Sequence, residues 1–215
     1  YKSSQKKNQL EKQYFLNIPC PTLTEEFKQI CEGRLSKLEC EAAIKQFKCN
    51  KSPGNDGITI EFYKKFWNTL GDKMVECFNF GYEKGELSTS QRQAIITLIE
   101  KHGKNRLLLK NWRPISLLNV DYKIITKSLS LRLKQVLPSI INMDQNGYVE
   151  GRQIFHSVRI IQDVMEITKK ENKGGIMLLV DMEKAFDSLE WDFLFAVLTK
   201  FNFGTDFTKW LKLLY

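Results

Sequence analysis

The order of apolar and polar residues predicts a mostly helical chain with few strands. A serine and a glutamate at capping-box spacing, followed by an apolar period, predict a helix over 37–48. The glycine- and proline-containing segment 50–57 predicts a turn. Helical spacing of aromatic residues then resumes and predicts two helices, which are separated at Gly71 and end at Gly85.

Two short runs rich in β-branched residues interrupt this helical pattern. They span 94–99 and 113–118 and are joined by a basic loop, so we expect an antiparallel hairpin. The next amphipathic pattern predicts a helix over 122–136. We expect Pro138 to close that helix, because proline lacks a backbone donor.

The last third of the chain changes pattern twice. After a helical period over 158–168, a short apolar run predicts a buried strand over 176–181 whose last residue is Asp181. Helical spacing returns over 189–201. At the other end, the first dozen residues are polar and lack a period, so we expect ordered structure to begin near Leu23.

These elements indicate an α+β fold in four segments. They are a polar leader or the tail of a preceding domain (1–22), an N-terminal helical segment (23–92), a hairpin with helices (93–175) and the first strand and helix of an incomplete further segment (176–215). The chain begins with Tyr1 and ends within a helix-like run, so we expect it to be cut at both ends.

Composition excludes several classes of protein. With 42% hydrophobic and 27% charged residues, the 215-residue chain resembles neither a disordered nor a collagen-like protein. Its apolar runs, such as 176–180, are far shorter than the roughly 20 residues that cross a bilayer, and the N-terminus has no signal-peptide segment. We therefore expect an intracellular protein without membrane attachment, whose five cysteines stay reduced.

Basic residues are concentrated in one block. The chain has 33 basic and 25 acidic residues, which gives a net charge of +8. Residues 101–150 hold nine of the basic and three of the acidic residues, and so contribute six of the eight net charges. Such a block attracts nucleic acid or a nucleoside triphosphate, but it is equally typical of a solvated helix face.

Asp181 is the metal-ligand candidate that the residues alone indicate. A rigid strand can aim a terminal carboxylate, and Mg²⁺ needs only one or two protein carboxylates when phosphates supply further oxygens. An aspartate in this position is also a common helix cap. The acid Asp187, which follows Phe186, favours the metal interpretation.

Four segments, in their order and spacing, resemble the reverse transcriptases of LINE-type (non-LTR) retrotransposons. They are Lys51–Ile58, Asn111–Asn119, Asp144–Arg152 and Val180–Asp187. The resemblance runs from about Leu35 to the C-terminus. It implies a right-hand polymerase fold, with fingers over 93–175 and the first palm strand in 176–215, truncated before the second catalytic motif.

The resemblance also implies RNA-directed DNA synthesis with two magnesium ions. Asp181 is then the catalytic residue and a metal ligand, and the main-chain carbonyl of Met182 is a further ligand. Lys101 and Arg113, on the two arms of the expected hairpin, are implied to bind the triphosphate. Phe186 matches the bulky residue that selects deoxynucleotides, although a core aromatic would fit the same position.

Six further residues are implied to bind the template. They are Gly54, Asp56, Gly57, Gln145, Gly147 and Arg152. By their chemistry alone, the first three indicate a tight turn that is structural as readily as functional. Arg152 either pairs with phosphate or closes the following helix, and Tyr148 and Trp112 either stack on bases or belong to a core.

Two positions depart from the family pattern. Glu100, before the lysine, and Asn55, in the first motif, stand where the family has proline. An acid beside Lys101 weakens its attraction for phosphate if both side chains share a face.

The family's second carboxylate element, Tyr-x-Asp-Asp, does not follow Asp181 within these 215 residues. One carboxylate cannot hold two divalent ions together, so we expect the isolated chain not to polymerise DNA. We also expect the exposed edge of the 176–181 strand to make the chain poorly soluble.

The leading hypothesis is therefore a fragment of a retrotransposon RNA-directed DNA polymerase. Its expected partners are an RNA template, a DNA primer or target DNA, and deoxynucleoside triphosphates. Its expected location is the nucleus, where target DNA lies, or a cytoplasmic ribonucleoprotein. Two alternatives stay open: a non-catalytic RNA- or DNA-binding module that uses the 101–150 block, and a decayed element without function.

Overall fold

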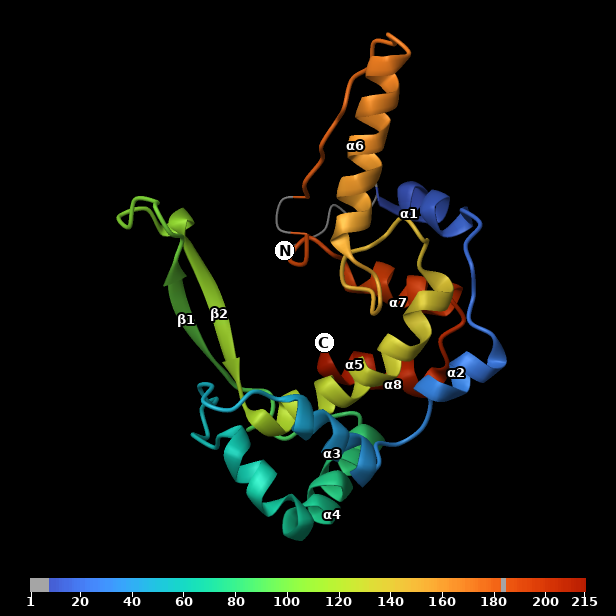
Figure 1. Cartoon of the computed structure of the whole chain (residues 1–215). Helices are drawn as coiled ribbons and strands as arrows, with labels where there is room; N and C mark the ends of the chain where they lie inside the picture. The colour runs from blue at the N-terminus through green and yellow to red at the C-terminus, as the bar shows by residue number, and fades with distance from the viewer. Residues whose placement is uncertain (1–7, 183–184) are drawn as a thin grey trace. The chain divides into compact units, whose positions relative to one another are not determined.

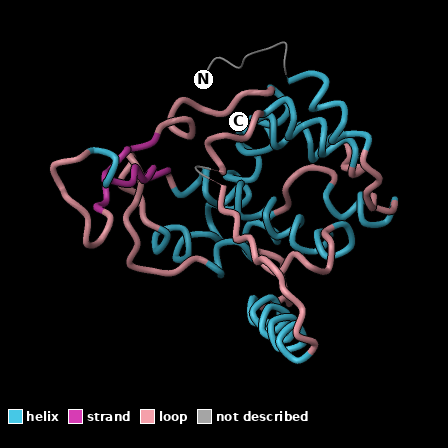
Figure 2. The backbone as a smooth tube through the Cα atoms, turned by 90° about the horizontal axis from the view of Figure 1, so that it is seen from above, coloured by secondary structure: helices cyan, strands magenta, loops and turns pink. Residues whose placement is uncertain are grey.

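The computed structural model describes residues 8–182 and 185–215, and it is mostly helical (Figure 1). Within these residues, strands occur in one hairpin only (Figure 2). The chain forms two compact units. Unit 1 comprises the described residues of 1–30 and 133–204, and unit 2 comprises 31–132 and 205–215.

Unit 2 packs helices around an aromatic and aliphatic core and carries the hairpin. Its elements are α3 (Lys37–Gln46), α4 (Ile60–Lys84), β1 (Ala94–Glu100), the short 3-10 helix η1 (Leu109–Asn111), β2 (Trp112–Leu118), the first part of α5 (Val120–Ile140) and α8 (Thr205–Leu214). The largest fully buried side chains are Phe78, Ile124, Ile125, Phe207 and Trp210. The Tyr82 ring stacks on that of Trp210 at a centroid distance of 4.5 Å, and its hydroxyl donates to Asp206.

The capping box confirms the helix predicted over 37–48, which the structure ends at Gln46. The Ser36 hydroxyl accepts from the Glu39 amide at 3.2 Å, and the Glu39 carboxylate accepts from the Ser36 amide at 2.9 Å. These bonds satisfy amides that a helix N-terminus otherwise leaves unpaired.

Gly71 does not separate two helices, so that prediction was wrong. α4 runs without a break through this position and ends, as predicted, at Gly85, which has a left-handed φ of 74°. A Cβ on Gly71 would lie 3.0 Å from Cε2 of Trp67 and 2.9 Å from Cε of Lys37. Glycine therefore serves close packing here, because the helix hydrogen bonds continue past it.

The predicted hairpin is confirmed, with strands slightly longer than expected. β1 and β2 pair antiparallel from Ala94 opposite Leu118 to Glu100 opposite Trp112. Figure 1 shows the hairpin extending away from α3 and α4 of the same unit. Both strands are largely exposed, so the hairpin is held mainly at its base.

Unit 1 joins the N-terminal helix to the last third of the chain. Its elements are α1 (Asn8–Asn17), most of α2 (Glu25–Cys31), the end of α5, α6 (Ile154–Lys170) and α7 (Trp191–Lys200). The Lys200 ammonium donates to the carbonyls of Leu16 and Ile18, and the Leu23 amide donates to Phe201 O at 2.9 Å. α1 shows that helical structure begins well before Leu23, because α1 packs against α7, a contact that local polarity does not reveal.

Pro138 also lies inside its helix rather than closing it. α5 continues to Ile140. Proline removes one donor, and the carbonyl of Pro138 itself accepts from the Arg152 guanidinium, which is described below. The predicted helices over 158–168 and 189–201 correspond to α6 and α7.

The strand predicted over 176–181 does not form, and this prediction was wrong for the described chain. The segment is irregular, and Ile176 and Val180 are 98% and 74% exposed. A strand needs a neighbour for its backbone hydrogen bonds, and this segment pairs with neither of the two strands among the described residues. The expected strand edge is therefore absent, although its apolar side chains still face solvent.

A buried cation organises the start of unit 2. The Arg132 guanidinium, whose side chain is 6% exposed, donates to both carboxylate oxygens of Glu39 at 2.6 and 3.0 Å. It also donates to the carbonyls of residues 31–34 at 2.7 to 3.1 Å. Burial raises the pKa of Glu39, but the hydrogen bonds from Arg132 and Ser36 outweigh burial and hold it below its ordinary value.

Among the helices described in both units, none combines the length and apolarity that crossing a bilayer requires.

Candidate functional site

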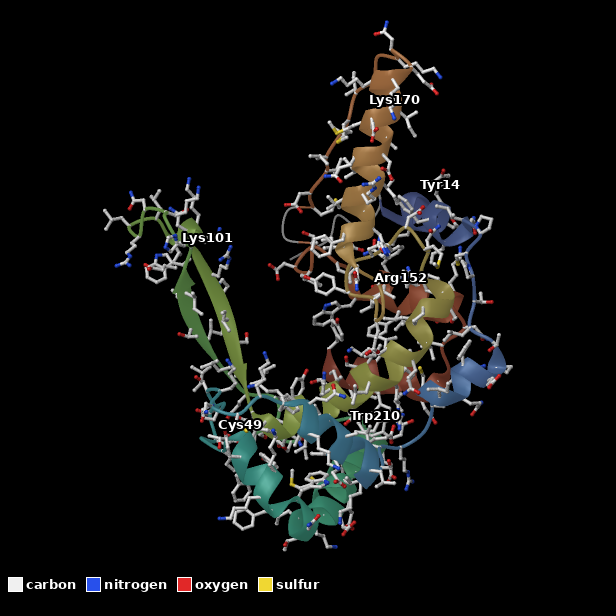
Figure 3. All side chains as sticks on the ribbon, viewed as in Figure 1. Tyr14, Cys49, Lys101, Arg152, Lys170 and Trp210 are labelled. Atoms are coloured by element: carbon white, nitrogen blue, oxygen red, sulfur yellow. The ribbon has the colours of Figure 1, made fainter. Side chains whose placement is uncertain are left out.

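The hairpin places the two expected triphosphate-binding residues on one face. Arg113 lies opposite Ile99 in the antiparallel register, and the Lys101 amide continues the ladder by donating to Asn111 O at 2.8 Å. Residues that lie opposite each other in the register share a face of the hairpin, so Arg113 shares a face with Ile99. Lys101 is two residues after Ile99 and lies on the same face, because side chains alternate between faces along a strand. Arg113 is exposed, and the Lys101 ammonium donates to the Lys110 carbonyl at 2.8 Å. Figure 3 shows Lys101 at the far end of the hairpin.

The opposite face of the hairpin holds the tip loop in place. The Arg106 guanidinium pairs with Glu100, and the Trp112 indole donates to Arg106 O at 2.9 Å. Glu100 and Trp112 are directly opposite each other in the register. The departure from the family pattern at Glu100 therefore does not neutralise Lys101, because its carboxylate is paired with a different cation.

The basic block of 101–150 is divided between surface and core. Four exposed cations lie in or beside the tip loop: Lys104, Arg106, Lys110 and Arg113. Arg132, by contrast, is buried and forms a salt bridge with Glu39. The exposed part of the block is thus concentrated on the hairpin, where a polyanion can reach it.

The first expected template-binding loop, at 54–57, is fixed to the base of the hairpin. A Cβ on Gly54 would lie 2.1 Å from Oδ1 of Asn119, so only glycine allows this approach. The Asp56 amide donates to the same oxygen at 3.3 Å, and the Asp56 carboxylate accepts from the Ile58 amide at 3.0 Å. Gly57 has a φ of 70°, which confirms the tight turn.

The residue Asn119 was not singled out by sequence reasoning. Its side chain is 1% exposed, and its Nδ2 donates to the carbonyl and hydroxyl of Ser90 at 2.9 and 3.1 Å. Nothing in the local pattern signals this role, because its partners are 29 and 63 residues away along the chain.

A partly buried carboxylate lies next to this loop. Burial raises the pKa of Asp121, and the charge of Asp56 adds to the increase, while hydrogen bonds from the Tyr122 amide and Gln91 oppose it. Asp121 is therefore a carboxylate whose ionised form is disfavoured in the folded state. Asp56 is exposed and remains accessible to a ligand.

The second expected template-binding loop is closed by Arg152. Its guanidinium donates to the carbonyls of Pro138, Ile141, Asn142 and Gln145, with 2.9 Å to Ile141 O and 2.8 Å to Gln145 O. It thus ties the end of α5 to the loop. Arg152 is labelled in Figure 3. The Gln145 side chain donates to Gly147 O at 3.3 Å, so the structure brings Gln145, Gly147 and Arg152 together.

Tyr148, next to Gly147, is 98% exposed and has a φ of 62°. Of its two alternatives, the position in a core is excluded for the described residues. An exposed aromatic ring in a left-handed backbone conformation is strained, and such conformations are typical of binding loops.

The expected metal-binding segment is not organised. Asp181, Met182 and Phe186 are exposed on irregular chain, with Met182 at 72% and Phe186 at 89%. Two residues of this motif, Glu183 and Lys184, lie outside the described residues. The exposure of Phe186 shows that it is not a core aromatic in this structure.

The described residues do not by themselves fit a two-ion site. In the part of the chain that the structure describes, no three His, Cys, Asp or Glu side chains come together in a way that could hold a metal ion. Asp181 alone supplies a carboxylate from the expected set, and divalent ions that repel each other need more than one.

Comparisons with known proteins give a consistent result. The model of the family described as reverse transcriptase (RNA-dependent DNA polymerase) matches residues 99–215. The chain is 41% identical over 195 residues to the Transposon TX1 uncharacterized 149 kDa protein of Xenopus laevis, across 91% of this chain and 15% of that protein.

Two insect proteins are more distant relatives. The chain is 25% identical over 161 residues to the putative 115 kDa protein in type-1 retrotransposable element R1DM of Drosophila melanogaster, across 73% of this chain. It is 25% identical over 158 residues to the retrovirus-related Pol polyprotein from type-1 retrotransposable element R1 of Bradysia coprophila, across 71% of this chain. The chain spans 15% of the length of each of these proteins.

Proposed function

Because the chain belongs to the reverse transcriptase family, of the type found in non-LTR retrotransposons, we propose that it supplies part of an RNA-directed DNA polymerase. In this proposal residues 93–175 contribute the fingers of a right-hand fold, and the segment from residue 176 contributes the start of the palm. The RNA template, the DNA primer or target DNA, and deoxynucleoside triphosphates are the proposed partners. We propose the nucleus as the location of synthesis.

The observation that carries the proposal is the face of the hairpin that bears Lys101 and Arg113. Two cations from opposite strands, on one face and without a carboxylate between them, suit the charge of a triphosphate. Arg113 is exposed and offers a planar donor fork, while the ammonium of Lys101 exchanges the Lys110 carbonyl for a phosphate oxygen. The pairing of Glu100 with Arg106 keeps the neighbouring acid away from this face.

The template-binding roles rest on loops rather than on charge. We propose that Gly54, Asp56 and Gly57 contact the template through exposed backbone, which glycine makes accessible. In the second loop, the Arg152 side chain is engaged with four carbonyls, so its proposed contribution is to shape the loop that presents Gln145 and Gly147. The exposed ring of Tyr148 offers a stacking surface for a base.

The reverse transcriptase family uses divalent metal ions, and we propose Asp181 and the Met182 carbonyl as ligands in the longer polypeptide. A bound ion there would neutralise charge on the phosphates. Phe186, exposed beside this segment, is the proposed residue that discriminates against a 2′-hydroxyl.

The experiment is primer extension on an RNA template by a longer polypeptide read from the same open reading frame. We expect incorporation of deoxynucleotides and its loss in Asp181→Asn. In Arg113→Ala we expect weaker binding of the deoxynucleoside triphosphate, seen as a higher KM. Arg92→Ala is the matched control, because Arg92 is an exposed arginine of unit 2 that pairs with Glu86 outside the hairpin. Equal activity of Asp181→Asn and the unaltered protein would refute the proposal.

A second candidate function is nucleic-acid binding without catalysis. The irregular 176–182 segment favours it for the 215-residue chain by itself, because Asp181 is not aimed by a strand. For this chain we expect duplex binding that falls with salt, through the exposed cations of the hairpin, and no primer extension.

A further inference from the structure

One buried amide joins three segments of unit 2. Asn119 stands between Leu118, the last residue of β2, and the start of α5. Its Nδ2 donates twice to Ser90, in the turn before β1, and its Oδ1 accepts from the Asp56 amide at 3.3 Å. With 1% of its surface exposed, this side chain has no access to water as an alternative partner.

The loop and the amide fit each other closely. The position of a Cβ on Gly54 would fall 2.1 Å from Asn119 Oδ1, 2.5 Å from Asn119 N and 2.6 Å from Leu118 C. The loop therefore reaches the end of β2 only because residue 54 is glycine. An apolar side chain at 119 would leave the Asp56 amide without its partner here.

A second bond holds the same loop to the other strand. The Asn55 side chain donates to Gln93 Oε1 at 3.1 Å, and Gln93 immediately precedes Ala94 of β1. Ala94 is paired with Leu118. The loop is thus fixed to both strands at the base of the hairpin, and seven residue pairs connect that base to the tip with Lys101.

We propose that Asn119 is a positioning residue that locks the 54–56 loop to the hairpin base. The loop and the Lys101–Arg113 face then move as one body, so template and triphosphate contacts are set in a common frame. Asn119 touches neither ligand in this arrangement. The functional part of this inference rests on the proposed function, whereas the lock itself does not.

The test compares Asn119→Ala with Asn79→Ala in the 215-residue chain. Asn79 is the matched control, because its amide also joins two segments of unit 2, with bonds of 2.9 and 3.0 Å to the Leu35 backbone, but it lies outside the loop and the hairpin. The first readout is hydrogen exchange at the Asp56 amide. The second is affinity for a fluorescein-labelled RNA–DNA duplex with a single-stranded RNA overhang, measured where both variants are fully folded.

We expect Asn119→Ala to speed exchange at Asp56 by about tenfold and to weaken duplex binding by a similar factor. Asn79→Ala should leave both unchanged. If Asn119→Ala does not fold, Asn55→Ala replaces it, since Asn55 is exposed and its bond to Gln93 is the outer half of the lock.

Unchanged exchange at Asp56 would overturn the lock. Faster exchange together with a binding loss no larger than that of Asn79→Ala would reduce Asn119 to a structural residue. Failure of the unaltered chain to bind the duplex would instead count against the proposed function and overturn the positioning role, while the exchange result would still decide whether the lock exists.

Discussion

Replacement of Arg132 by methionine should destabilise unit 2 strongly. The change keeps much of the side-chain volume but removes a buried cation that bonds Glu39 and the carbonyls of residues 31–34. Breaking a buried ion pair by removing one partner costs about 3–5 kcal/mol. The Glu39 side chain is 34% exposed and can regain some water, so we expect a loss near the lower end, about 3 kcal/mol.

Urea unfolding followed by tryptophan fluorescence measures this loss. Trp67 and Trp210 are both buried in unit 2 and report its unfolding. Lys127→Met is the matched control, because it removes a cation from the same helix that makes no ion pair among the described residues, and it should change stability by less than about 0.5 kcal/mol. A loss for Arg132→Met no greater than that of Lys127→Met would refute the reasoning.

The pH dependence provides an independent check on the same pair. The folded-state pKa of Glu39 is below its ordinary value, so its stabilisation is present above the ordinary carboxyl pKa and is lost as the pH falls through the folded pKa. Arg132→Met should flatten this acid-side slope. A second replacement, Glu39→Gln, should then cost little more, because the carboxylate has already lost its partner.

Three further predictions concern single positions in unit 2. Gly54→Ala should lower the free energy of unfolding by about 1–3 kcal/mol in urea titrations, because its Cβ overlaps Oδ1 of Asn119. Asp121→Asn should raise stability at neutral pH, because the folded-state pKa of Asp121 is raised. The stability that protonated Asp121 contributes is fully present below the unfolded pKa and is lost as the pH rises through the folded pKa. Curves of unfolding free energy against pH for the two proteins should therefore converge in acid. Ser36→Ala should cost about 1 kcal/mol by loss of the cap, whereas Ser52→Ala, at an exposed loop position, should leave the unfolding midpoint unchanged.

Elements whose stabilising partners are close in sequence could be predicted. The hairpin and its basic loop lie within 25 residues, 94–118, so alternation and turn residues specify both strands. α3 carries its own capping box. The positions that misled were Gly71 and Pro138, because Gly71 serves close packing against the ring of Trp67 within a continuous helix, and Pro138 lies in the last turn of α5, which ends two residues later.

The candidate site shows the same limit. Sequence alone placed Lys101 and Arg113 on two arms of a hairpin, and the observed register assigns them to one face. It could not separate Arg132, a buried structural cation, from the exposed cations of the same basic block. It also gave no role to Asn119, the last residue of the Asn111–Asn119 segment, because a buried asparagine acquires its role from segments that the fold brings to it.

The contrast between the hairpin and the 176–181 segment explains why one half of the expected site is formed and the other is not. Each strand of the hairpin has its hydrogen-bonding partner within 24 residues along the chain, so its register and the face of its cations follow from local sequence. The segment before Asp181 has the apolar composition of a strand, but it pairs with neither strand of the hairpin, and its side chains from Ile176 to Val180 are 49–98% exposed. A carboxylate is aimed by the strand that carries it, and that strand exists only when it is paired. The geometry around Asp181 is therefore a property of long-range pairing, whereas the geometry around Lys101 is a property of the hairpin itself.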